Sequence, residues 1–359
     1  MNPVRVSVTG FYGTGSSAVI DLLKEYKNAH NVPEVGIPYE HTTFYSAGGL
    51  FDLCTLLTKG NAPLQSDYVI NNFIDKMKQL NDYDYLWFGS FKKLTGDKFM
   101  DSVHEFVDKI SVHHKGTNYN HVIKTRFSPV KAILQLIAHI VYKKKFKKYG
   151  VGYVYDNKPI YYSNLTSDEL YQAVREFTKR YFDIFASPDS ELDIYDHLIW
   201  PQQVDSHARC FDDNFKIIIV NRDPRDVYIS DQFLWCKPPL GRGKPHFDEN
   251  PLKFIDEWNK TVSPEYHNPN VLRIQFEDLI YNYDETVCEI ENFLGLSPSA
   301  HINKRKFFIP EKSINNTQVF LRDSKWEGLS ILLAEHLPEF IYNFPYKFEA
   351  KKSDVFGTV

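Results

Sequence analysis

A short glycine-containing segment near the start of the chain has the residue types and spacing of a phosphate-binding loop. Gly10 and Gly15 are separated by four residues, and Ser16 and Ser17 follow directly. Such a loop points backbone N–H groups at an anion, and a helix that begins behind it adds the positive end of its dipole. In the ATP-binding version, G-x-x-x-x-G-K-[ST], a lysine contacts the β- and γ-phosphates. Ser16 replaces that lysine, so the segment predicts a nucleotide other than ATP, or a strand-to-helix turn that binds nothing.

A second anion-binding pattern follows a predicted buried strand much further along the chain. The apolar run at 216–220 precedes the segment 221–230, which reads N-R-D-P-R-D-V-Y-I-S. Pro224 favours a helix start, and Ser230, about a turn and a half later, can return toward the strand end where Arg222 emerges. An arginine fork beside a hydroxyl is a good receptor for a terminal phosphate. The same residue types also form a salt-bridged helix cap, and spacing alone leaves both interpretations open.

These two segments resemble motifs of the sulfotransferases that use 3′-phosphoadenosine 5′-phosphosulfate (PAPS). That family has R-[ND]-P-[RK]-D-x-x-x-S after a central strand, and Arg222 and Ser230 match the positions that hold the donor's 3′-phosphate there. The loop at 10–17 corresponds to the family's 5′-phosphosulfate loop, which usually ends in S-G-T-T, whereas residues 14–17 here read T-G-S-S. The resemblance implies PAPS as co-substrate, no metal, and a donor site that includes Gly13, Thr14, Gly15, Ser16, Ser17, Arg222 and Ser230.

A third segment extends the resemblance toward the end of the chain. Residues 271–279, V-L-R-I-Q-F-E-D-L, and 290–296, I-E-N-F-L-G-L, look like the structural R-Y-E-D-L and F-L-G-L stretches of the family. The style of the motifs is most similar to bacterial capsule or glycan sulfotransferases. It implies in-line transfer of a sulfuryl group from PAPS to a hydroxyl of a carbohydrate or glycolipid. The ranges 45–120 and 143–205 match no motif, and we expect them to be insertions that carry the acceptor site.

The glycine loop departs from the family pattern at Gly13, where relatives usually carry lysine or arginine. Another cation must then neutralise the charge that develops on the leaving phosphate. Lys124 is the candidate, because residues 122–125 predict a strand that ends in a cation and resemble the K-T-H stretch of the cytosolic sulfotransferases. Arg126 occupies the position of the catalytic histidine in that stretch, and arginine cannot take a proton from a hydroxyl. A surface lysine at a strand end is the alternative interpretation of Lys124.

The general base is therefore expected elsewhere. Carbohydrate sulfotransferases similar to this chain use a glutamate early in the fold, and Glu40 lies at a similar distance after the first predicted helix. A carboxylate beside a polyanionic donor holds a proton more readily than one in water, which suits a general base. His41 and Glu34 are rival candidates, and a solvent-facing turn is the alternative to all three.

Two lysine-containing segments complete the set of candidates. Lys312 lies where the family has a basic donor-gripping loop, which assigns it to the 3′-phosphate; a plain polar loop explains it equally well. The run from Lys143 to Lys148 follows an amphipathic segment at 129–142. Such a run is typical of a solvated face, and the alternatives are a groove for an anionic glycan or a contact with a membrane of anionic lipid.

The elements that position these residues follow from the spacing of the apolar residues. Strand, glycine loop and helix are predicted in succession over 4–9, 10–15 and 16–26, and further strands at 121–125, 216–221 and 271–276. Helical periodicity recurs at 47–58, 66–80, 97–113, 129–144, 167–186, 252–261, 284–294 and 326–337. Strands that alternate with helices predict an α/β fold with a central, mainly parallel sheet flanked by helices, of the P-loop sulfotransferase type. We expect a single domain over 1–359.

Composition excludes several other classes of protein. The net charge of −4 argues against a nucleic-acid coat, so no nucleic-acid partner is expected. The four cysteines form no C-x-x-C pair, which favours free thiols in a reducing compartment. The longest apolar stretch, 130–142, is interrupted by polar residues, and no apolar leader precedes the first strand, so a cytoplasmic protein is expected. A small-molecule P-loop kinase and a non-catalytic nucleotide-binding protein remain the alternative functions.

Overall fold

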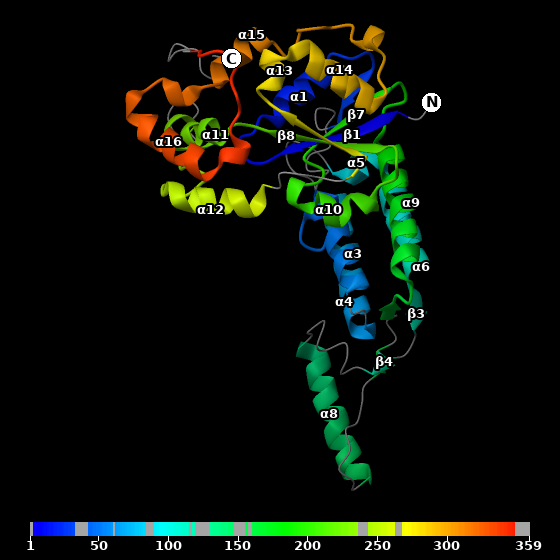
Figure 1. Ribbon diagram of the computed structural model, residues 1–359. Coiled ribbons are helices and arrows are strands. Elements are labelled where there is room, and N and C mark those ends of the chain that lie inside the picture. Colours follow the sequence, from blue (N-terminus) through cyan, green and yellow to red (C-terminus); the bar gives the residue numbers. More distant parts are fainter. Residues whose placement is uncertain are drawn as a thin grey trace. The chain divides into compact units, whose positions relative to one another are not determined.

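The structure is a computed structural model of the chain (Figure 1). It describes residues 3–32, 42–59, 62–83, 90–114, 117–118, 129–146, 155–156, 160–235, 243–262 and 268–348. The chain divides into two compact units. The sheet unit comprises Met1–His41 and Ala186–Val359, and the inserted unit comprises Thr42–Phe185. The chain therefore leaves the sheet unit after its first segment and returns to it at residue 186.

A five-stranded sheet in the order β2-β7-β1-β8-β9 forms the centre of the sheet unit. Each adjacent pair of strands is parallel. The strands are β1 (Val4–Gly10), β2 (Ala29–Asn31), β7 (Leu192–Asp196), β8 (Phe215–Asn221) and β9 (Val271–Gln275). Inner strands of a parallel sheet are covered on both faces, which explains why residues 217–220 form one continuous buried apolar run. The predicted α/β fold with a mainly parallel sheet is confirmed.

The sheet unit also contains helices, some of which pack on the sheet. They are α1 (Ser16–Leu23), α10 (Val204–His207), α11 (Pro224–Ser230), α12 (Pro251–Thr261), α13 (Asp278–Tyr281), α14 (Tyr283–Leu294), α15 (Pro310–Ser313) and α16 (Glu327–His336). Figure 1 shows α1, α13 and α14 on one side of the sheet. There Leu22 of α1 and Ile290 of α14 join Val6 and Val8 of β1 in one buried cluster. Side chains alternate between faces along a strand, so Val6 and Val8 both point to this layer.

The parallel arrangement brings the residues that follow each strand to one edge of the sheet. The glycine loop 10–17 follows β1, His197 follows β7, Arg222 follows β8 and Phe276 follows β9. Ligands of open α/β sheets bind outside the carboxyl ends of the strands. This edge is therefore where the two predicted anion motifs meet.

The inserted unit is mainly helical and has its own aromatic core. Its helices are α2 (Thr42–Tyr45), α3 (Leu50–Thr58), α4 (Pro63–Asp82), α5 (Phe91–Thr95), α6 (Lys98–Ile110), α8 (Pro129–Phe146) and α9 (Ser167–Phe185). Two antiparallel pairs accompany them: β3 (Val112–His114) with β6 (Ile160–Tyr162), and β4 (Thr117–Asn118) with β5 (Tyr155–Asp156). Phe73 of α4 meets Phe106 of α6 and Phe177 of α9, with ring centroids 5.7 and 5.9 Å away. These edge-on contacts hold the three helices together.

Most of the predicted elements are present in the structure. Helices occur in all eight of the ranges with helical periodicity, and the strands predicted at 216–221 and 271–276 are β8 and β9. The strand predicted at 121–125 lies outside the described residues. Strand β7 falls within the range 143–205, which we expected to be an insertion, yet it pairs with β1 in the central sheet. Its two aspartates in five residues conceal the apolar pattern of a buried strand.

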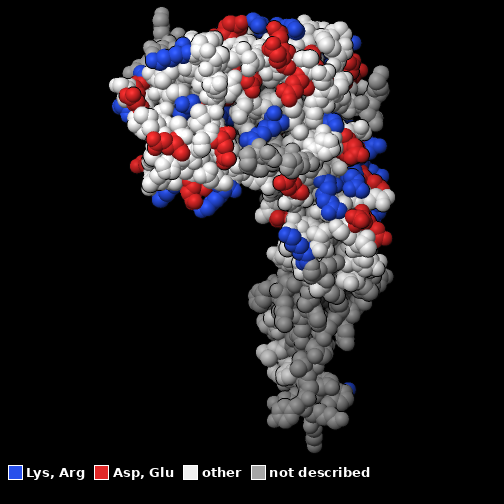
Figure 2. Space-filling view, in the orientation of Figure 1, with Lys and Arg blue, Asp and Glu red and all other residues white. Residues whose placement is uncertain are grey.

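The described residues give one finding on membrane-spanning helices and one on surface charge. Among the described residues, no helix combines the length and the apolar character needed to cross a bilayer. Figure 2 shows basic and acidic side chains interspersed over the described surface in this view. That mixture matches the small net charge of the chain.

Candidate functional site

A cavity of about 480 Å³ lies at the carboxyl edge of the sheet, within the sheet unit. The whole stretch from Phe11 to Ala18 lines it, and Arg222 and Phe276 contribute from the ends of the neighbouring strands. His197 lines it from the end of β7. The structure therefore brings the glycine loop and Arg222 around one space, as the two motifs predict.

The glycine loop has a backbone that only glycine adopts easily. Gly13 and Gly15 have φ angles of +76° and +93°. A Cβ on Gly13 would lie 2.5 Å from the Trp235 ring, and a Cβ on Gly15 would lie 2.7 Å from the Phe276 ring. The buried Thr14 hydroxyl donates a hydrogen bond to the Phe11 carbonyl at 2.8 Å, which closes the turn. The loop is thus fixed in a shape that a side chain at either glycine would disrupt.

The N-terminus of α1 faces the same cavity. Ser16 and Ser17 open the helix, and both line the cavity. Gly15 is the residue before the helix, and no side chain there caps the first turn. The first N–H groups of a helix without such a cap favour an anionic ligand. These residues fit the predicted role of binding the 5′-phosphosulfate.

Arg222 connects the end of β8 to the glycine loop. Its side chain is buried, with the residue only 4% exposed. Nη1 donates to the Gly13 carbonyl at 3.0 Å, and Nη2 donates to the Asn316 carbonyl. The guanidinium lies 5.2 Å from the centre of the Phe276 ring. Its Nε is buried and has no hydrogen-bond partner among the described residues.

The other two residues predicted to bind the 3′-phosphate are placed differently. Ser230, at the end of α11, is fully buried and does not line the cavity. Its Oγ has no hydrogen-bond partner among the residues that the structure describes. Lys312 is exposed in α15 and does not line the cavity, whereas its neighbour Ser313 does. For both residues the binding role stays a prediction.

The helix cap and the lining of the cavity use different residues of the motif at 221–230. Asp223 caps α11 by accepting from Arg225 N at 2.9 Å, and the Arg225 guanidinium makes two further bonds to the Asp223 carboxylate. Asp226 accepts from the backbone N–H groups of Gln318 and Val319 at 2.8 and 2.6 Å. These residues build the cap, and Arg222 alone of the charged side chains in this motif lines the cavity.

The cap places three carboxyl groups in a buried cluster. Burial and the neighbouring Asp223 carboxylate raise the pKa of Glu277 to about 8 and the pKa of Asp226 to about 7. Glu277 accepts from the Asp223 backbone N–H at 2.9 Å. Both groups hold a proton more tightly in the folded chain than in the unfolded chain. Their contribution to stability is therefore present at low pH and is lost as the pH rises toward 8.

Glu277→Gln tests this proton linkage. In the unchanged protein, the free energy of unfolding should fall between about pH 5 and 8. In Glu277→Gln we expect a shallower fall, by at most about 1.4 kcal/mol per pH unit, because glutamine keeps the acceptor oxygen and cannot ionise. Urea unfolding at a series of pH values measures the slope. The exposed Glu285→Gln is the matched control, and an unchanged slope in Glu277→Gln contradicts the assignment.

Another buried carboxylate, that of Glu25, holds in place the loop whose residues Phe307 and Phe308 form one wall of the cavity. Glu25 follows α1, and its oxygens accept from the backbone N–H groups of Phe307 and Phe308 at 2.9 and 3.0 Å and of Arg305 at 2.9 Å. His301 Nε2 lies 2.8 Å from the same carboxylate. The side chains of Glu25 and His301 are both fully buried. The loop that supplies this wall is thus fixed to the end of α1 by one side chain.

Glu25→Gln should destabilise the protein by about 3 kcal/mol, because the amide removes the charge and turns an N–H group toward buried donors. Thermal or urea unfolding measures the change. Glu335→Gln, an exposed substitution of the same kind in α16, should leave stability unchanged. Equal stability of the two variants would show that Glu25 does not anchor this loop.

His197 is a candidate functional residue that the sequence analysis missed. It follows β7 directly, lines the cavity, and has a φ of +52°, a conformation that residues other than glycine seldom adopt. Its Nδ1 contacts a carboxylate oxygen of Asp196, and its backbone N–H donates to the Val8 carbonyl at 2.9 Å. A carboxylate that binds Nδ1–H leaves Nε2 free to accept a proton. The available signal was an Asp-His pair at the end of a short strand.

Aromatic side chains give the cavity flat apolar walls. Tyr12, Trp235 and Phe276 line it together with Phe307 and Phe308. The Tyr12 ring lies edge-on to Trp235, with the centroids 5.8 Å apart. Flat rings beside an arginine and a glycine loop suit a ligand that has both a base and phosphates.

The predicted catalytic residues lie outside the described residues. They are Glu40 and Lys124, with the rivals Glu34 and His41 and the non-basic Arg126. Their roles stay predictions. Among the described residues, no group of three or more His, Cys, Asp or Glu side chains could hold a metal ion.

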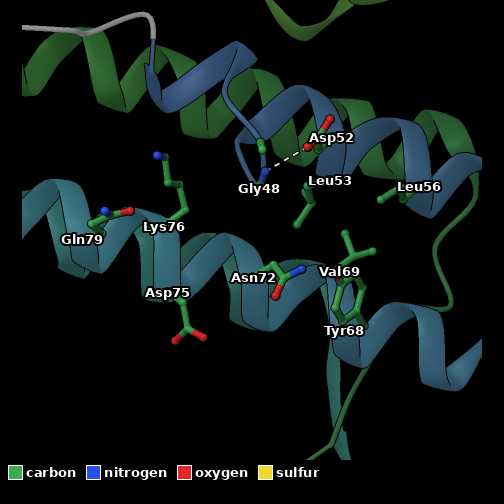
Figure 3. Close-up of a pocket in the computed structure, with 11 residues that line it drawn as sticks. Gly48, Asp52, Leu53, Leu56, Tyr68, Val69, Asn72, Asp75, Lys76 and Gln79 are labelled. Carbon is green, nitrogen blue, oxygen red and sulfur yellow. Dashed lines mark hydrogen bonds between the residues drawn. The ribbon is translucent and has the colours of Figure 1, made fainter. Parts of the chain in front are cut away.

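A second cavity, of about 430 Å³, lies within the inserted unit between α3 and α4 (Figure 3). Leu53, Leu56 and Val69 line one part of it, and the polar residues Asp52, Asn72, Asp75, Lys76 and Gln79 line the rest. Asp52 accepts a hydrogen bond from the Gly48 N–H at 2.8 Å, which fixes the turn before α3. The cavity falls within the range 45–120, where we expected acceptor-binding residues.

Comparison with known proteins agrees with the motifs. A model of the sulfotransferase domain family matches residues 5–318. Among solved structures, the chain is similar to retinol dehydratase in complex with androsterone and the inactive cofactor PAP, with 14% identity over 97% of this chain and 83% of that one and a TM-score of 0.31. It is also similar to sulfotransferase STF9 from Mycobacterium avium, with 12% identity over 97% of this chain and 79% of that one and a TM-score of 0.38. No curated protein matches. Because the family match covers most of the chain, this protein belongs to the PAPS-dependent sulfotransferase family.

Proposed function

We propose that this sulfotransferase moves the sulfuryl group of PAPS to a hydroxyl of a carbohydrate or glycolipid acceptor. The observation that carries the donor half is the single cavity that the glycine loop and Arg222 share. The Arg222–Gly13 hydrogen bond of 3.0 Å joins the two anion motifs directly. The cavity has room for a nucleotide and is lined by aromatic rings.

Each part of the donor has a candidate partner in this cavity. The N–H groups of the glycine loop and of the first turn of α1 bind the 5′-phosphosulfate. Arg222, whose side chain lines the cavity, binds the 3′-phosphate. Ser230 and Lys312, which do not line the cavity, are assigned to the same phosphate only by the motif resemblance. The flat side chains of Tyr12, Trp235 and Phe276 suit the adenine base.

The transfer needs a group that takes the proton of the acceptor hydroxyl. As the hydroxyl oxygen bonds to sulfur, the bond from sulfur to the phosphate oxygen breaks and the hydroxyl proton passes to the base. His197 is the candidate that the described residues supply, because its Nδ1 is held by Asp196 and its ring lines the donor cavity. Glu40 is the candidate from the sequence. Lys124 and the loop N–H groups neutralise the leaving phosphate.

The cavity of the inserted unit supports a carbohydrate acceptor. Tyr68 lines it with a half-exposed ring, and amide, carboxylate and ammonium groups from Asp52, Asn72, Lys76 and Gln79 line the same space. Such polar groups exchange hydrogen bonds with sugar hydroxyls, and an aromatic ring packs on the apolar face of a sugar. Figure 3 shows Lys76 extending from α4 to the side on which Gly48 and Asp52 lie.

Radiolabelled PAPS incubated with a panel of glycans and glycolipids tests this function. We expect labelled product with at least one carbohydrate acceptor and a higher KM for that acceptor in Tyr68→Ala, with donor affinity unchanged. Tyr83→Ala, an exposed tyrosine that does not line this cavity, is the control. Transfer to phenols or steroids and not to any carbohydrate would contradict the acceptor class. Phosphate transfer from ATP with Mg²⁺ would favour a kinase instead.

A further inference from the structure

Helix α8 (Pro129–Phe146) of the inserted unit has a row of large apolar side chains exposed to solvent. Their exposed fractions run from 45% to 66%, and the residues are Val130, Ile133, Leu134, Leu136, Ile137, Ile140 and Val141. At 3.6 residues per turn these positions fall within an arc of about 160°. The half-buried Ala138 and His139 fall outside that arc. The seven residues therefore make up one side of the helix, which we call the apolar face of α8.

The apolar face of α8 differs from the other exposed apolar residues. Leu252, Ile302 and Ile331 are exposed to a similar degree, but each lies in a different part of the sheet unit. Single exposed apolar side chains are normal on soluble proteins, whereas a contiguous apolar patch marks an interaction surface. The concentration of seven such residues on one helix therefore calls for a binding partner.

Positive charge accompanies this face. From Lys131 to Lys148 the chain contains six lysines and no aspartate or glutamate, although the complete chain has a net charge of −4. Lys144 and Lys145, in the last turn of α8, are exposed. The segment thus joins a wide apolar face to a concentrated basic end.

We propose that α8, with the lysines of its last turn, docks on a membrane surface that contains anionic phospholipid, with the helix lying in the plane of the interface. A bilayer surface offers an apolar layer and negative headgroups together, and amphipathic helices with lysines bind there. No described helix is apolar and long enough to span the bilayer, which favours a helix lying in the interface. The inference does not depend on the acceptor or on the donor site.

Other binding partners would match only one of the two features, either the apolar face of α8 or the lysines. A second copy of α8 would cover the apolar face, but it would bring six more lysines and no carboxylate from the same segment. A soluble anionic glycan would bind the lysines and would leave the apolar face in water. The combination of both features favours the lipid surface.

Co-sedimentation of the full chain with lipid vesicles tests the proposal. Vesicles of phosphatidylcholine with about 30% phosphatidylglycerol should bind the protein at least about tenfold more tightly than vesicles of phosphatidylcholine alone, because lysines near an anionic surface add to the binding energy. Added salt should weaken the binding to the anionic vesicles. No binding to the anionic vesicles would overturn the proposal.

Two triple variants separate the apolar and the basic contributions. Ile133→Gln with Ile137→Gln and Ile140→Gln removes the centre of the apolar face, and Lys143→Gln with Lys144→Gln and Lys145→Gln removes half of the lysines. Each should weaken binding to anionic vesicles by about 100-fold. Two matched controls make the same kinds of change on the sheet unit. The apolar control combines Leu252→Gln, Ile302→Gln and Ile331→Gln, and the basic control combines Lys253→Gln, Lys260→Gln and Lys325→Gln. Both controls should bind anionic vesicles as tightly as the unchanged protein does. Circular dichroism melting confirms that each variant is folded.

The same samples distinguish the other occupants. The unchanged protein could fail to bind vesicles and instead self-associate in sedimentation experiments. If the isoleucine variant then loses this self-association, the apolar face of α8 binds a second copy of the chain. Heparin binding lost in the lysine variant, again without vesicle binding, would assign the lysines to an anionic glycan. Either result overturns the membrane proposal. Binding of adenosine 3′,5′-bisphosphate by both triple variants should stay unchanged.

Discussion

His197→Ala is expected to lower kcat by about 10²–10⁴-fold, the usual effect of losing a general base. The ring lines the donor cavity, and its Nδ1 is bound by Asp196, so Nε2 is the atom that accepts the proton. The left-handed backbone at His197 supports a functional constraint, because such strain persists mainly at functional sites. Single-turnover transfer from radiolabelled PAPS measures the effect on the chemical step.

Glu40→Gln in the same assay decides between the two candidate bases. Glutamine keeps the size and hydrogen bonding of the glutamate and removes its basic site. A large loss in Glu40→Gln with normal turnover in His197→Ala would contradict the assignment to His197 and confirm the prediction made from the sequence. The acid limb of the pH–rate profile gives a second readout, because a histidine base loses activity at higher pH than a glutamate base. His336→Ala, an exposed histidine in α16, is the matched control.

Arg222→Ala should weaken the binding of adenosine 3′,5′-bisphosphate by about 10- to 150-fold, equivalent to about 1.5–3 kcal/mol for a charged hydrogen bond to phosphate. The substitution also removes the bonds to the carbonyls of Gly13 and Asn316, so the glycine loop loses its connection to β8. Ser230→Ala should act in the same direction with a smaller effect. Isothermal titration calorimetry measures both affinities.

Arg225→Ala is the matched control for this prediction. Arg225 belongs to the same motif, but its guanidinium binds Asp223 and it does not line the cavity. We expect it to lower stability and to leave the affinity of the folded protein for the bisphosphate nearly unchanged. If Arg222→Ala binds the ligand as tightly as Arg225→Ala does, Arg222 is not the phosphate receptor.

The sequence predicts that the two anion motifs lie at one edge of the sheet, because each motif is local. The glycine loop and Arg222 each follow a strand whose apolar run is visible in the sequence, and parallel strands bring their carboxyl ends to one edge. For the motif at 221–230, the sequence alone does not say which arginine lines the cavity. Spacing leaves the helix cap and the phosphate receptor as alternatives, whereas the structure assigns Arg225 to the cap and Arg222 to the cavity.

The rest of the site depends on contacts that are distant in sequence. His197 follows a five-residue strand that contains two aspartates, so neither the strand nor its place beside β1 could be inferred from periodicity. Glu25 binds the backbone of residues 305–308, far along the chain, and nothing local to α1 indicates that partner. The inserted unit contains helices with clear periodicity but no motif, so the cavity between α3 and α4 could not be predicted from the sequence.

Calorimetric titration with adenosine 3′,5′-bisphosphate, AMP and ATP tests the proposed donor site, because we expect the bisphosphate alone to contact both the glycine loop and Arg222. We expect the bisphosphate to bind at least about tenfold more tightly than AMP, and Arg222→Ala to remove most of this difference, since the 3′-phosphate then loses its charged partner. We also expect no preference for ATP with Mg²⁺, because Ser16 replaces the lysine that ATP-binding loops use. Equal affinities for AMP and the bisphosphate, or tighter binding of ATP than of either, would contradict the assignment of this cavity to PAPS.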